Sequence, residues 1–451
     1  AHWNQAAWFE TAADLDLGAL QQALNALVTH HPMLRARFHL GDAGWQQEVV
    51  AEAPVIELER IALSGLEPAE QDEALLASAN ILHAGLNLSR GPLLRAAWFD
   101  LGNDRRPRLF ITVHHLVIDA VSWNILVPNL LTSYRQIAAG EPPSLPAVRM
   151  SYARWSEKQA RLAQSPRMRH ESTYWRQTSR QAAPLPRDGT SDKDNTEGEA
   201  DLVTVVLDGA HTEQLLREAN NAYHTRIDDL LLAAMAHAVC SWNGERSLLL
   251  NLERHGREEI DPQFDMSQTV GWFTSLFPVT LALPEKSDAG DTIRTVKEQL
   301  RAIPQNGIGY GILRYLGDED IRQELATKLQ PEILFNYLGV AADNKENAGP
   351  IRRMAASTGQ AYGPQNKRAH LIDVNAQIVD GRLRVRWQYA PAYFQKTTIE
   401  KVALAFINEL GRIIDHCLEV EQGQYTPSDF PLADLQQNDL DSLSDLLAEV
   451  E

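Results

Sequence analysis

The sequence predicts an α/β protein of two comparable lobes. Segments with helical and with strand periodicity alternate along the chain, which is typical of α/β architecture. The alternation occurs twice, before and after a stretch at 184–199 that is rich in Pro, Asp, Gly and Thr and has no periodicity. A chain of 451 residues is long enough for two or three units with cores of their own. We therefore expect an N-terminal lobe at 1–183, a linker at 184–200, a C-terminal lobe at 201–424 and a C-terminal segment at 425–451.

The N-terminal half opens on a strand-like segment, and its periodicity predicts three helices. Leucines at helical spacing predict an amphipathic helix over 15–28, and similar patterns predict helices over 70–86 and 124–139. Residues 109–113 (LFITV) are expected to form a buried strand, because β-branched and aromatic residues favour strands.

The C-terminal half repeats this alternation of strands and helices. Strands are predicted at 202–207, 247–252, 333–337, 372–379 and 383–389, and helices at 210–223, 229–241, 291–302 and 398–418. One segment, 307–311 (GIGYG), has too many glycines for a helix or a strand, so we expect it to be neither.

Composition excludes several classes of function. The chain carries 42 Lys+Arg against 60 Asp+Glu, a net charge of −18, which argues against a nucleic-acid surface or an anionic membrane patch. Two cysteines, Cys240 and Cys417, are too few for a disulfide framework or a structural zinc site, so a reducing, cytoplasmic location is expected. The longest apolar run, Leu230–Val239, is too short to span a bilayer, and residues 2–5 lack the features of a signal peptide. We therefore expect no membrane and no nucleic acid among the partners.

The strongest local signal is a polar triplet, His114, His115 and Asp119, at the end of the predicted strand 109–113. Buried imidazoles and carboxylates need specific partners, so this cluster is unusual core filling. Strand alternation sends the two histidines to opposite faces, so one of them can face a given cavity. An isolated His-His pair is nonetheless more often structural than functional. Metal binding by His115 and Asp119 is a further alternative, but neither a helical His pair nor a cysteine cluster supports it.

A second polar cluster, residues 253–258 (ERHGRE), follows the apolar strand 248–252. Alternation would direct Glu253 and His255 to one side and Arg254 to the other. A solvated charged turn is the common explanation for such a cluster. However, each lobe then ends a buried strand in a residue capable of acid–base chemistry, which suggests a functional cleft between the lobes.

Three further segments have unusual compositions. Residues 269–274 (TVGWFT) place large aromatic side chains beside a glycine, and 335–339 (FNYLG) end a strand with an amide and a phenol. The glycines at 307–311 lack the strand-then-helix context of a nucleotide-binding loop. Each segment alone is more typical of a core or a turn.

Taken together, the ordered set of segments resembles the epimerization domain of non-ribosomal peptide synthetases, a branch of the condensation-domain superfamily. His114–Trp123 (HHLVIDAVSW) in the N-terminal lobe resembles the HHxxxDG motif. Further similar segments follow in the expected order: 229–234, 253–258 (ERHGRE), 269–278 (TVGWFTSLFP), 304–311 (PQNGIGYG), 335–339 (FNYLG) and 425–432 (YTPSDFPL).

The sequence departs from the family pattern in four places. The opening PIQxWF motif is missing, Ala120 replaces a glycine, Arg254 replaces the glycine of EGHGRE, and Gln268 stands in place of an arginine. If Arg254 shares a cavity with Glu253, it would lower the pKa of that carboxyl and weaken it as a base.

The resemblance implies a fold of two chloramphenicol-acetyltransferase-like lobes that form a V-shaped pseudo-dimer with a central tunnel. It implies inversion of an aminoacyl or peptidyl group from L to D at Cα, as in antibiotic biosynthesis. The substrate would be a thioester on the phosphopantetheine arm of an upstream peptidyl carrier domain, and this domain would bind no cofactor or metal of its own. The adenylation domain of the same module and a downstream condensation domain, reached through the exit segment 425–451, are the other implied partners.

The resemblance also suggests roles for individual residues. Inversion needs a base on one face of Cα, an acid on the other and a group that stabilises the enolate. His115 and Glu253 fit the first two roles, and Tyr337 and Asn336 the third or a proton relay. Structural roles near the site are implied for His114, Trp123, Asp119 and Arg257, the last two as an ion pair. The implied substrate channel includes Trp272, Phe273, Thr274, Gly309 and Tyr310.

Two alternatives to an epimerase remain open. A peptide-bond-forming condensation domain shares the fold and the HHxxxD motif but normally lacks segments like ERHGRE and FNYLG. A catalytically silent module that recruits partners is the second alternative. Intact His115, Asp119 and Glu253 count against it, whereas Arg254 and Ala120 keep it open.

Overall fold

The structure is a computed structural model, and it describes most of the chain. The described residues are 2–42, 44–178, 183–190, 194–258, 265–285, 288–327, 330–341, 349–433, 435–440 and 442. Parts of the predicted linker (191–193) and of the C-terminal segment (434, 441 and 443–451) lie outside these residues.

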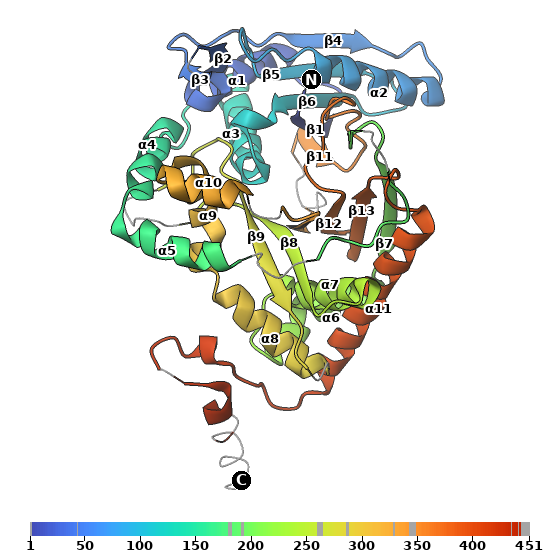
Figure 1. Ribbon diagram of the computed structural model, residues 1–451. Helices are drawn as coiled ribbons and strands as arrows, with labels where there is room; N and C mark the ends of the chain where they lie inside the picture. Colours follow the sequence, from blue (N-terminus) through green and yellow to red (C-terminus); the bar gives the residue numbers. More distant parts are fainter. Residues whose placement is uncertain are drawn as a thin grey trace.

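The N-terminal lobe is built on a five-stranded sheet (Figure 1). Its strand order is β11 (Ile351–Met354), β1 (Asn4–Thr11), β6 (Arg108–His114), β5 (Leu94–Asp100) and β4 (Leu58–Ala62). Alternate side chains of these strands pack on opposite faces of the sheet. Phe9 and Leu109 join the core under helices α1 (Leu17–His30) and α3 (Ala120–Ala138), whereas Trp8 and Phe110 pack under α2 (Pro68–Ala84).

The C-terminal lobe is built on a six-stranded mixed sheet. Its strand order is β7 (Asp201–Val206), β13 (Arg382–Tyr389), β12 (Ile372–Val379), β10 (Ile333–Val340), β8 (Ser247–Arg254) and β9 (Ser275–Ala282). Strand β10 runs parallel to both β8 and β12, so these three strands end at the same edge of the sheet.

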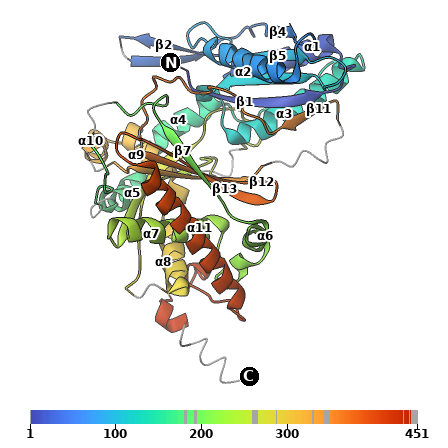
Figure 2. The same ribbon diagram turned by 90° about the vertical axis from the view of Figure 1, so that its right-hand side faces the viewer.

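Four helices cover the face of this sheet that is turned away from the N-terminal lobe (Figures 1 and 2). They are α6 (Gly209–Arg217), α7 (Ile227–Asn243), α8 (Ala289–Arg301) and α11 (Lys396–Glu419). The apolar run Leu248–Leu252 in β8 is buried on both faces of the strand. One face packs on these helices, and the side chains of the other face are also shielded from solvent. The opposite face of the sheet is left to face the first lobe.

The remaining elements connect or flank the two sheets. They are a hairpin of β2 (Ala36–Gly41) and β3 (Gly44–Val49), helices α4 (Tyr152–Ala163), α5 (Pro166–Gln177), α9 (Ile308–Leu316) and α10 (Glu319–Thr327), and short 3-10 turns at Pro32–Arg35, His115–Val117, Ala219–Asn221, Pro304–Gly307 and Pro427–Asp429.

The two α/β lobes exchange segments. Strand β11 comes from the C-terminal half of the chain, yet it pairs antiparallel with β1 in the N-terminal sheet. Helix α5 precedes the linker, yet its Met168 and Trp175 belong to the hydrophobic core of the C-terminal lobe. These crossings tie the lobes together beyond what a linker at 184–200 alone provides.

The two-lobed α/β architecture predicted from the sequence is confirmed, as are most of the predicted elements. The helix predicted over 210–223 is shorter, because α6 ends at Arg217 and a 3-10 turn follows it. The prediction for 307–311 was wrong, because helix α9 begins at Ile308. Gly307 adopts a left-handed φ of 87° before the helix, and a side-chain carbon at Gly309 would overlap the carboxylate of Glu171. Close packing of α9 on α5 therefore outweighs the low helix propensity of glycine.

The start of the C-terminal segment is anchored to the C-terminal lobe by a buried lysine. Lys297 on α8 donates to the backbone oxygen of Tyr223 at 2.8 Å and to the carboxylate of Asp429 at 2.7 and 2.6 Å. A buried ammonium group needs such partners, so this contact fixes residues 427–429 against α8.

Among the described residues, no helix is both long and apolar enough to cross a membrane. Within the same residues, no group of three or more His, Cys, Asp or Glu side chains is arranged to hold a metal ion.

The glycine-rich start of α9 gives a matched pair of substitutions. Gly307→Ala should destabilise the protein by roughly 2 kcal/mol or more, because its φ is left-handed and an added carbon would overlap the ring of Phe277. Gly311→Ala, in the same helix with open space around it, should stabilise by about 0.5–1 kcal/mol. Urea denaturation of both variants checks this expectation, and equal effects of the two substitutions would contradict it.

Candidate active site

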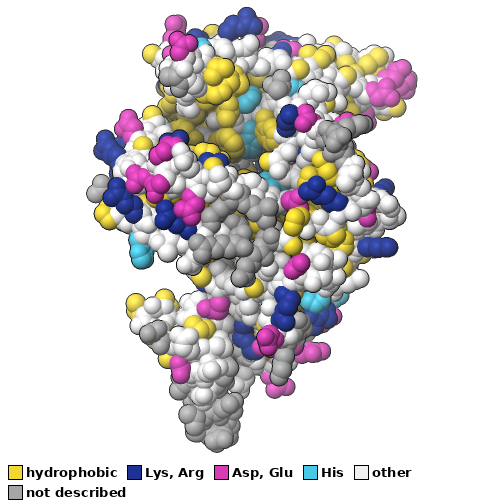
Figure 3. Space-filling view, viewed as in Figure 1, with side chains coloured by type: hydrophobic (Ala, Val, Ile, Leu, Met, Phe, Trp, Pro, Cys, Tyr) yellow, Lys and Arg dark blue, Asp and Glu magenta, His cyan; other side chains and the backbone are white. Residues whose placement is uncertain are grey.

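A large cavity lies between the two lobes. Its volume is about 770 Å³. From the N-terminal lobe it is lined by strands β1 and β11 and the start of helix α3, and from the C-terminal lobe by β8, β10 and the start of α7. Figure 3 shows a hollow beneath the upper lobe, lined by apolar side chains, with histidine side chains visible inside it. This size suits an extended organic substrate.

The histidine motif sits where β6 ends and a 3-10 turn begins. His114 is buried, and its Nδ1 accepts a hydrogen bond from the backbone N–H of Leu116 at 3.2 Å, which stabilises the turn. Burial, with smaller contributions from His115 and His2, lowers the pKa of His114 to about 4. His114 is therefore a neutral hydrogen-bond acceptor in the turn.

His115 adjoins the cavity through Gln5. Its Nε2 lies 2.9 Å from Nε2 of Gln5, a residue of β1 that lines the cavity, and its ring meets Trp272 edge-on at a centroid distance of 5.3 Å. Trp123 donates from its indole N–H to Gln5 Oε1 at 2.9 Å. Burial lowers the pKa of His115 below its ordinary value of 6.5, although backbone carbonyls and Asp119 partly oppose this.

Asp119 and Arg257 form an ion pair between the lobes. Arg257 Nη2 donates to the two carboxylate oxygens of Asp119 at 3.0 and 3.2 Å and to the hydroxyl of Ser122 at 3.1 Å. The side chain of Arg257 is 9% exposed and that of Asp119 is 3% exposed, so the charges are almost fully removed from water. The resemblance had suggested this pair, and the structure places the two residues accordingly.

The same carboxylate organises the backbone on both sides. Asp119 caps α3 by accepting from the N–H of Ser122 at 2.7 Å, and it accepts from the N–H of Phe273 at 3.2 Å. Arg257 donates to the backbone oxygen of Thr269 at 2.7 Å, and its guanidinium lies 4.1 Å from the centroid of the Phe273 ring. The pair therefore positions the His115 turn and the 269–274 segment relative to each other.

Glu253 lines the cavity from the end of β8. Burial and then the negative charge of Asp373 raise its pKa to about 7, against a hydrogen bond from Asn336 that lowers it. The expectation that Arg254 would lower this pKa was wrong. Arg254 also lines the cavity, but it forms an ion pair with Asp228 at the start of α7, and burial determines the titration of Glu253.

Asn336 and Tyr337 line the cavity from β10, next to Glu253. Burial, with the charge of Asp228, raises the pKa of Tyr337 to about 12, so its phenol stays protonated and can donate a hydrogen bond. Tyr362 also lines the cavity, and burial together with the charges of Glu197 and Glu253 raises its pKa to about 12.

Sequence reasoning missed Gln5, Arg353 and Tyr362 as residues of this site. All three line the cavity, but none belongs to a motif with a recognised catalytic spacing. One signal was available for Gln5, because the polar pair Asn4-Gln5 directly precedes the apolar run Ala6–Phe9 of the same strand. Arg353 lies on β11, and its place in the first lobe depends on a strand pairing that local sequence patterns do not reveal.

The residues predicted to form the substrate channel separate into two groups. Thr274 lines the cavity, Trp272 contacts His115, and Phe273 is buried under Arg257. Gly309 and Tyr310 lie on α9 and do not line this cavity. Gly309 packs closely on Glu171, and the Tyr310 ring meets Trp175 at a centroid distance of 5.2 Å, so packing of α9 accounts for both.

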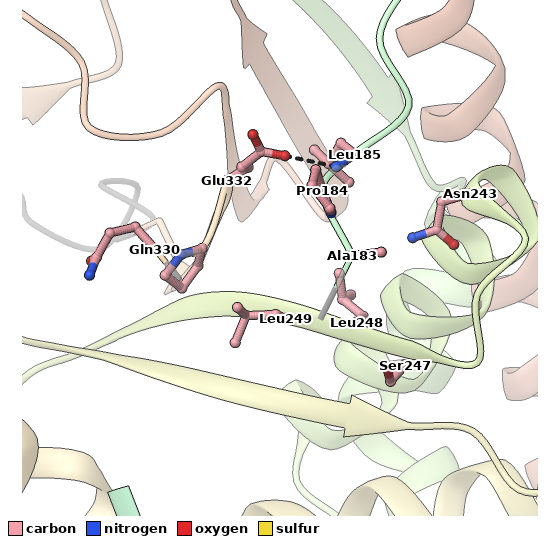
Figure 4. A pocket seen from close by; sticks show the side chains of 10 residues that line it. Ala183, Pro184, Leu185, Asn243, Ser247, Leu248, Leu249, Gln330 and Glu332 are labelled. Carbon is pink, nitrogen blue, oxygen red and sulfur yellow. Dashed lines mark hydrogen bonds between the residues drawn. The ribbon is translucent and has the colours of Figure 1, made fainter. Parts of the chain in front are cut away.

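A second, much smaller pocket lies away from this site, beside the linker (Figure 4). It has a volume of about 20 Å³, and the carboxylate of Glu332 at its edge accepts from the N–H of Leu185 at 2.7 Å. Such a space holds about one water molecule. It is too small for a substrate.

Comparison with known proteins places this architecture in a family. The sequence profile of the family described as "Condensation domain" matches residues 1–435. The chain belongs to the condensation-domain family. Linear gramicidin synthase subunits D and C of Brevibacillus parabrevis are each 39% identical to this condensation-family domain, over 446 and 443 residues. The matches cover 98% of the chain but 9% and 6% of the two subunits, so the chain spans less than a tenth of these relatives.

Solved structures share the fold of this condensation-family domain. The epimerization domain from the third module of tyrocidine synthetase B superposes with a TM-score of 0.85 at 33% identity, and 93% of each chain is covered. The X-domain from teicoplanin biosynthesis shares the fold with a TM-score of 0.73 at 18% identity, with 92% of this chain and 91% of that chain covered.

The Asp119–Arg257 pair predicts a large effect on stability. Asp119→Ala leaves the arginine charge buried and removes the cap of α3, so the free energy of unfolding should fall by about 3–5 kcal/mol. As a control, Asp72→Ala removes a carboxylate that is 60% exposed and pairs with Arg105, which should cost less than about 1 kcal/mol. Thermal and urea melts measure both. An unchanged melting temperature in Asp119→Ala, with catalysis abolished, would instead place Asp119 in the chemistry.

Proposed function

We propose that this domain inverts the Cα of an aminoacyl or peptidyl group, from L to D, while the group is held as a thioester on the phosphopantetheine arm of a carrier domain. The observation that carries the proposal is Glu253, a half-buried carboxyl with a pKa of about 7, which lines the same interlobe cavity as Gln5, the hydrogen-bond partner of His115. Similarity to the tyrocidine synthetase epimerization domain supports it.

The two groups have the protonation states that inversion requires. A thioester acidifies the Cα proton, so a base on one face and an acid on the other suffice to remove and return a proton. Near pH 7 His115 is neutral, because its pKa is lowered, and about half of Glu253 is protonated. A neutral imidazole and a carboxylic acid form a matched base and acid. After one inversion the proton has moved from one group to the other, which readies the pair for the reverse reaction.

Loss of the Cα proton creates an enolate, which needs hydrogen-bond donors. Tyr337 retains its proton because its pKa is about 12, and Asn336 carries an amide beside Glu253. Both line the cavity, so we assign them to the enolate oxygen or to proton relay. On this proposal the domain needs no cofactor or metal of its own.

The partners follow from the substrate. The relatives are much longer synthase subunits, which supports a place for this domain beside other synthetase domains. We assign the upstream peptidyl carrier domain as the substrate donor, the adenylation domain of the same module as the source of its amino acid, and a downstream condensation domain as the consumer of the product.

Peptide-bond formation is a second candidate, because the matching family is described as a condensation domain. In that reaction His115 would assist an attacking amine, and a carboxyl with a pKa of about 7 would have no required part. The substitution of Glu253 therefore distinguishes the two candidates.

Substitution of either proposed acid–base group should reduce inversion. His115→Ala and Glu253→Gln should each slow epimerization by at least about 10²-fold, the usual contribution of a positioned acid or base. Glu258→Gln, in the same motif but outside the cavity, is the control and should retain activity. A carrier domain loaded with an L-aminoacyl thioester is incubated with each variant and hydrolysed, and the D/L ratio is measured by chiral chromatography. A folded Glu253→Gln protein with the wild-type rate would remove Glu253 from the mechanism.

The pKa values of the two groups predict a bell-shaped pH dependence. In the reactive form the two groups together carry one titratable proton: Glu253 is protonated and His115 is neutral. Above about pH 7 this proton is lost from Glu253, so kcat/KM should fall with a midpoint near 7. On the acid side, activity should fall only below the ordinary histidine pKa of 6.5, because the pKa of His115 is lowered. A rate that keeps rising beyond about pH 8 would contradict the assignment of Glu253 as the acid.

A further inference from the structure

The side chain of Gln5 stands between Trp123 and His115, and it belongs to no part of the predicted site. It extends from β1, where Gln5 is paired with Val113 of β6, next to the histidine motif. Its amide oxygen accepts from the indole N–H of Trp123 at 2.9 Å, and its amide nitrogen lies 2.9 Å from Nε2 of His115. Both contacts are partly buried, and Gln5 and Trp123 line the cavity.

Hydrogen-bond chemistry fixes the direction of this chain. An indole nitrogen can only donate, so it must meet the amide oxygen of Gln5. The amide NH₂ is then directed at His115, and because this group also only donates, Nε2 of His115 must be the acceptor. A neutral imidazole that accepts at Nε2 carries its proton at Nδ1.

Protonation of Nε2 conflicts with either orientation of the Gln5 amide. If the amide stays in place, its N–H faces the N–H of the ring. If it turns over, its N–H faces the indole N–H of Trp123. In both cases one hydrogen-bond donor loses its acceptor in a partly buried setting, which is unfavourable.

We propose that Gln5 is a positioning residue that holds His115 as a neutral imidazole, with the proton at Nδ1 and the lone pair of Nε2 directed at the Gln5 amide, and that Trp123 fixes the orientation of Gln5. The catalytic consequence rests on the proposed function of His115 as a base, whereas the choice of tautomer does not depend on it. Because Nε2 has one lone pair, the N–H of Gln5 must move away from it before this nitrogen accepts the Cα proton, and until then Gln5 keeps His115 unprotonated.

Other charges around His115 act in the opposite or a neutral sense. Among the described residues, Asp119 favours the charged ring, and His114 is itself neutral near pH 7. Asp119 is paired with Arg257, and Trp272 presents an aromatic ring to His115. Glu253 and Arg353 line the cavity from β8 and β11. The donor from Gln5 therefore reinforces burial in opposing protonation of His115.

The tautomer can be read directly by NMR. The full chain is labelled with ¹⁵N-histidine, long-range ¹H–¹⁵N spectra are recorded from about pH 6 to about pH 8, and His115→Ala identifies the signals of His115. Wild type should show a neutral ring protonated at Nδ1. Trp123→Phe, which removes the indole N–H and leaves the amide free to turn, should show a mixture of the two neutral tautomers. A wild-type ring protonated at Nε2, or an unchanged ring in Trp123→Phe, would overturn the proposal.

Gln5→Glu tests the same point with a near-isosteric change. A carboxylate accepts from both Trp123 and His115, so it should stabilise the imidazolium and raise the pKa of His115. The acid limb of the epimerization profile should then move to higher pH. At pH values well below this limb's midpoint, the epimerization rate should fall about tenfold for each unit by which the pKa of His115 rises. Gln46→Glu, an exposed glutamine on β3 that is paired with His39, makes the same change of charge and should leave the His115 signals and the profile unchanged.

The two kinds of outcome separate this proposal from the proposed function. An unmoved acid limb and an unchanged His115 spectrum in a folded Gln5→Glu protein would overturn the role of Gln5. If the wild type shows no epimerization, the proposed function fails, but the NMR spectra of wild type and Trp123→Phe still decide whether Gln5 selects the tautomer.

Discussion

The buried ion pair between Asp119 and Arg257 is the interaction on which the site depends. It joins residues 138 positions apart in the chain, and it is surrounded by the start of α3, the 269–274 segment and the turn that carries His115. A buried pair of this kind contributes little net stability compared with an apolar pair, but it is costly to break. We interpret it as a device that fixes one arrangement of the two lobes. The cavity between the lobes keeps its shape because this arrangement is fixed.

The residues at the cavity acquire their chemistry from burial. Removal from water lowers the pKa of His115 and raises that of Glu253 to about 7, so near neutral pH the imidazole is neutral and part of the Glu253 population is protonated. Neighbouring groups then adjust each one, through Asp373 and Asn336 at Glu253 and through Gln5 at His115. The N-terminal lobe supplies the imidazole and the C-terminal lobe supplies the carboxyl. Neither lobe alone has both.

Local sequence patterns predicted the fold and the motif-bearing part of the site. The leucine run of β8 predicted the strand, and the polar residues that follow it indicated Glu253 as a candidate site residue. Local patterns did not predict the features of the structure that depend on long-range packing. Helix α9 forms despite its glycines because α5 packs against it, and Arg353 reaches the first lobe because β11 pairs with β1. Gln5 lies 110 positions from His115, and the pairing of β1 with β6 brings the two together.

The origin of the hydrogen at Cα in the product tests the central claim most directly. A carrier-bound L-aminoacyl thioester is incubated with the domain in D₂O, and the D-configured product is analysed by mass spectrometry. If one group removes the Cα proton and a second, solvent-exchanged group returns one from the opposite face, each D product should carry deuterium at Cα. A D product that retains its original hydrogen, or no D product at all, would contradict the account.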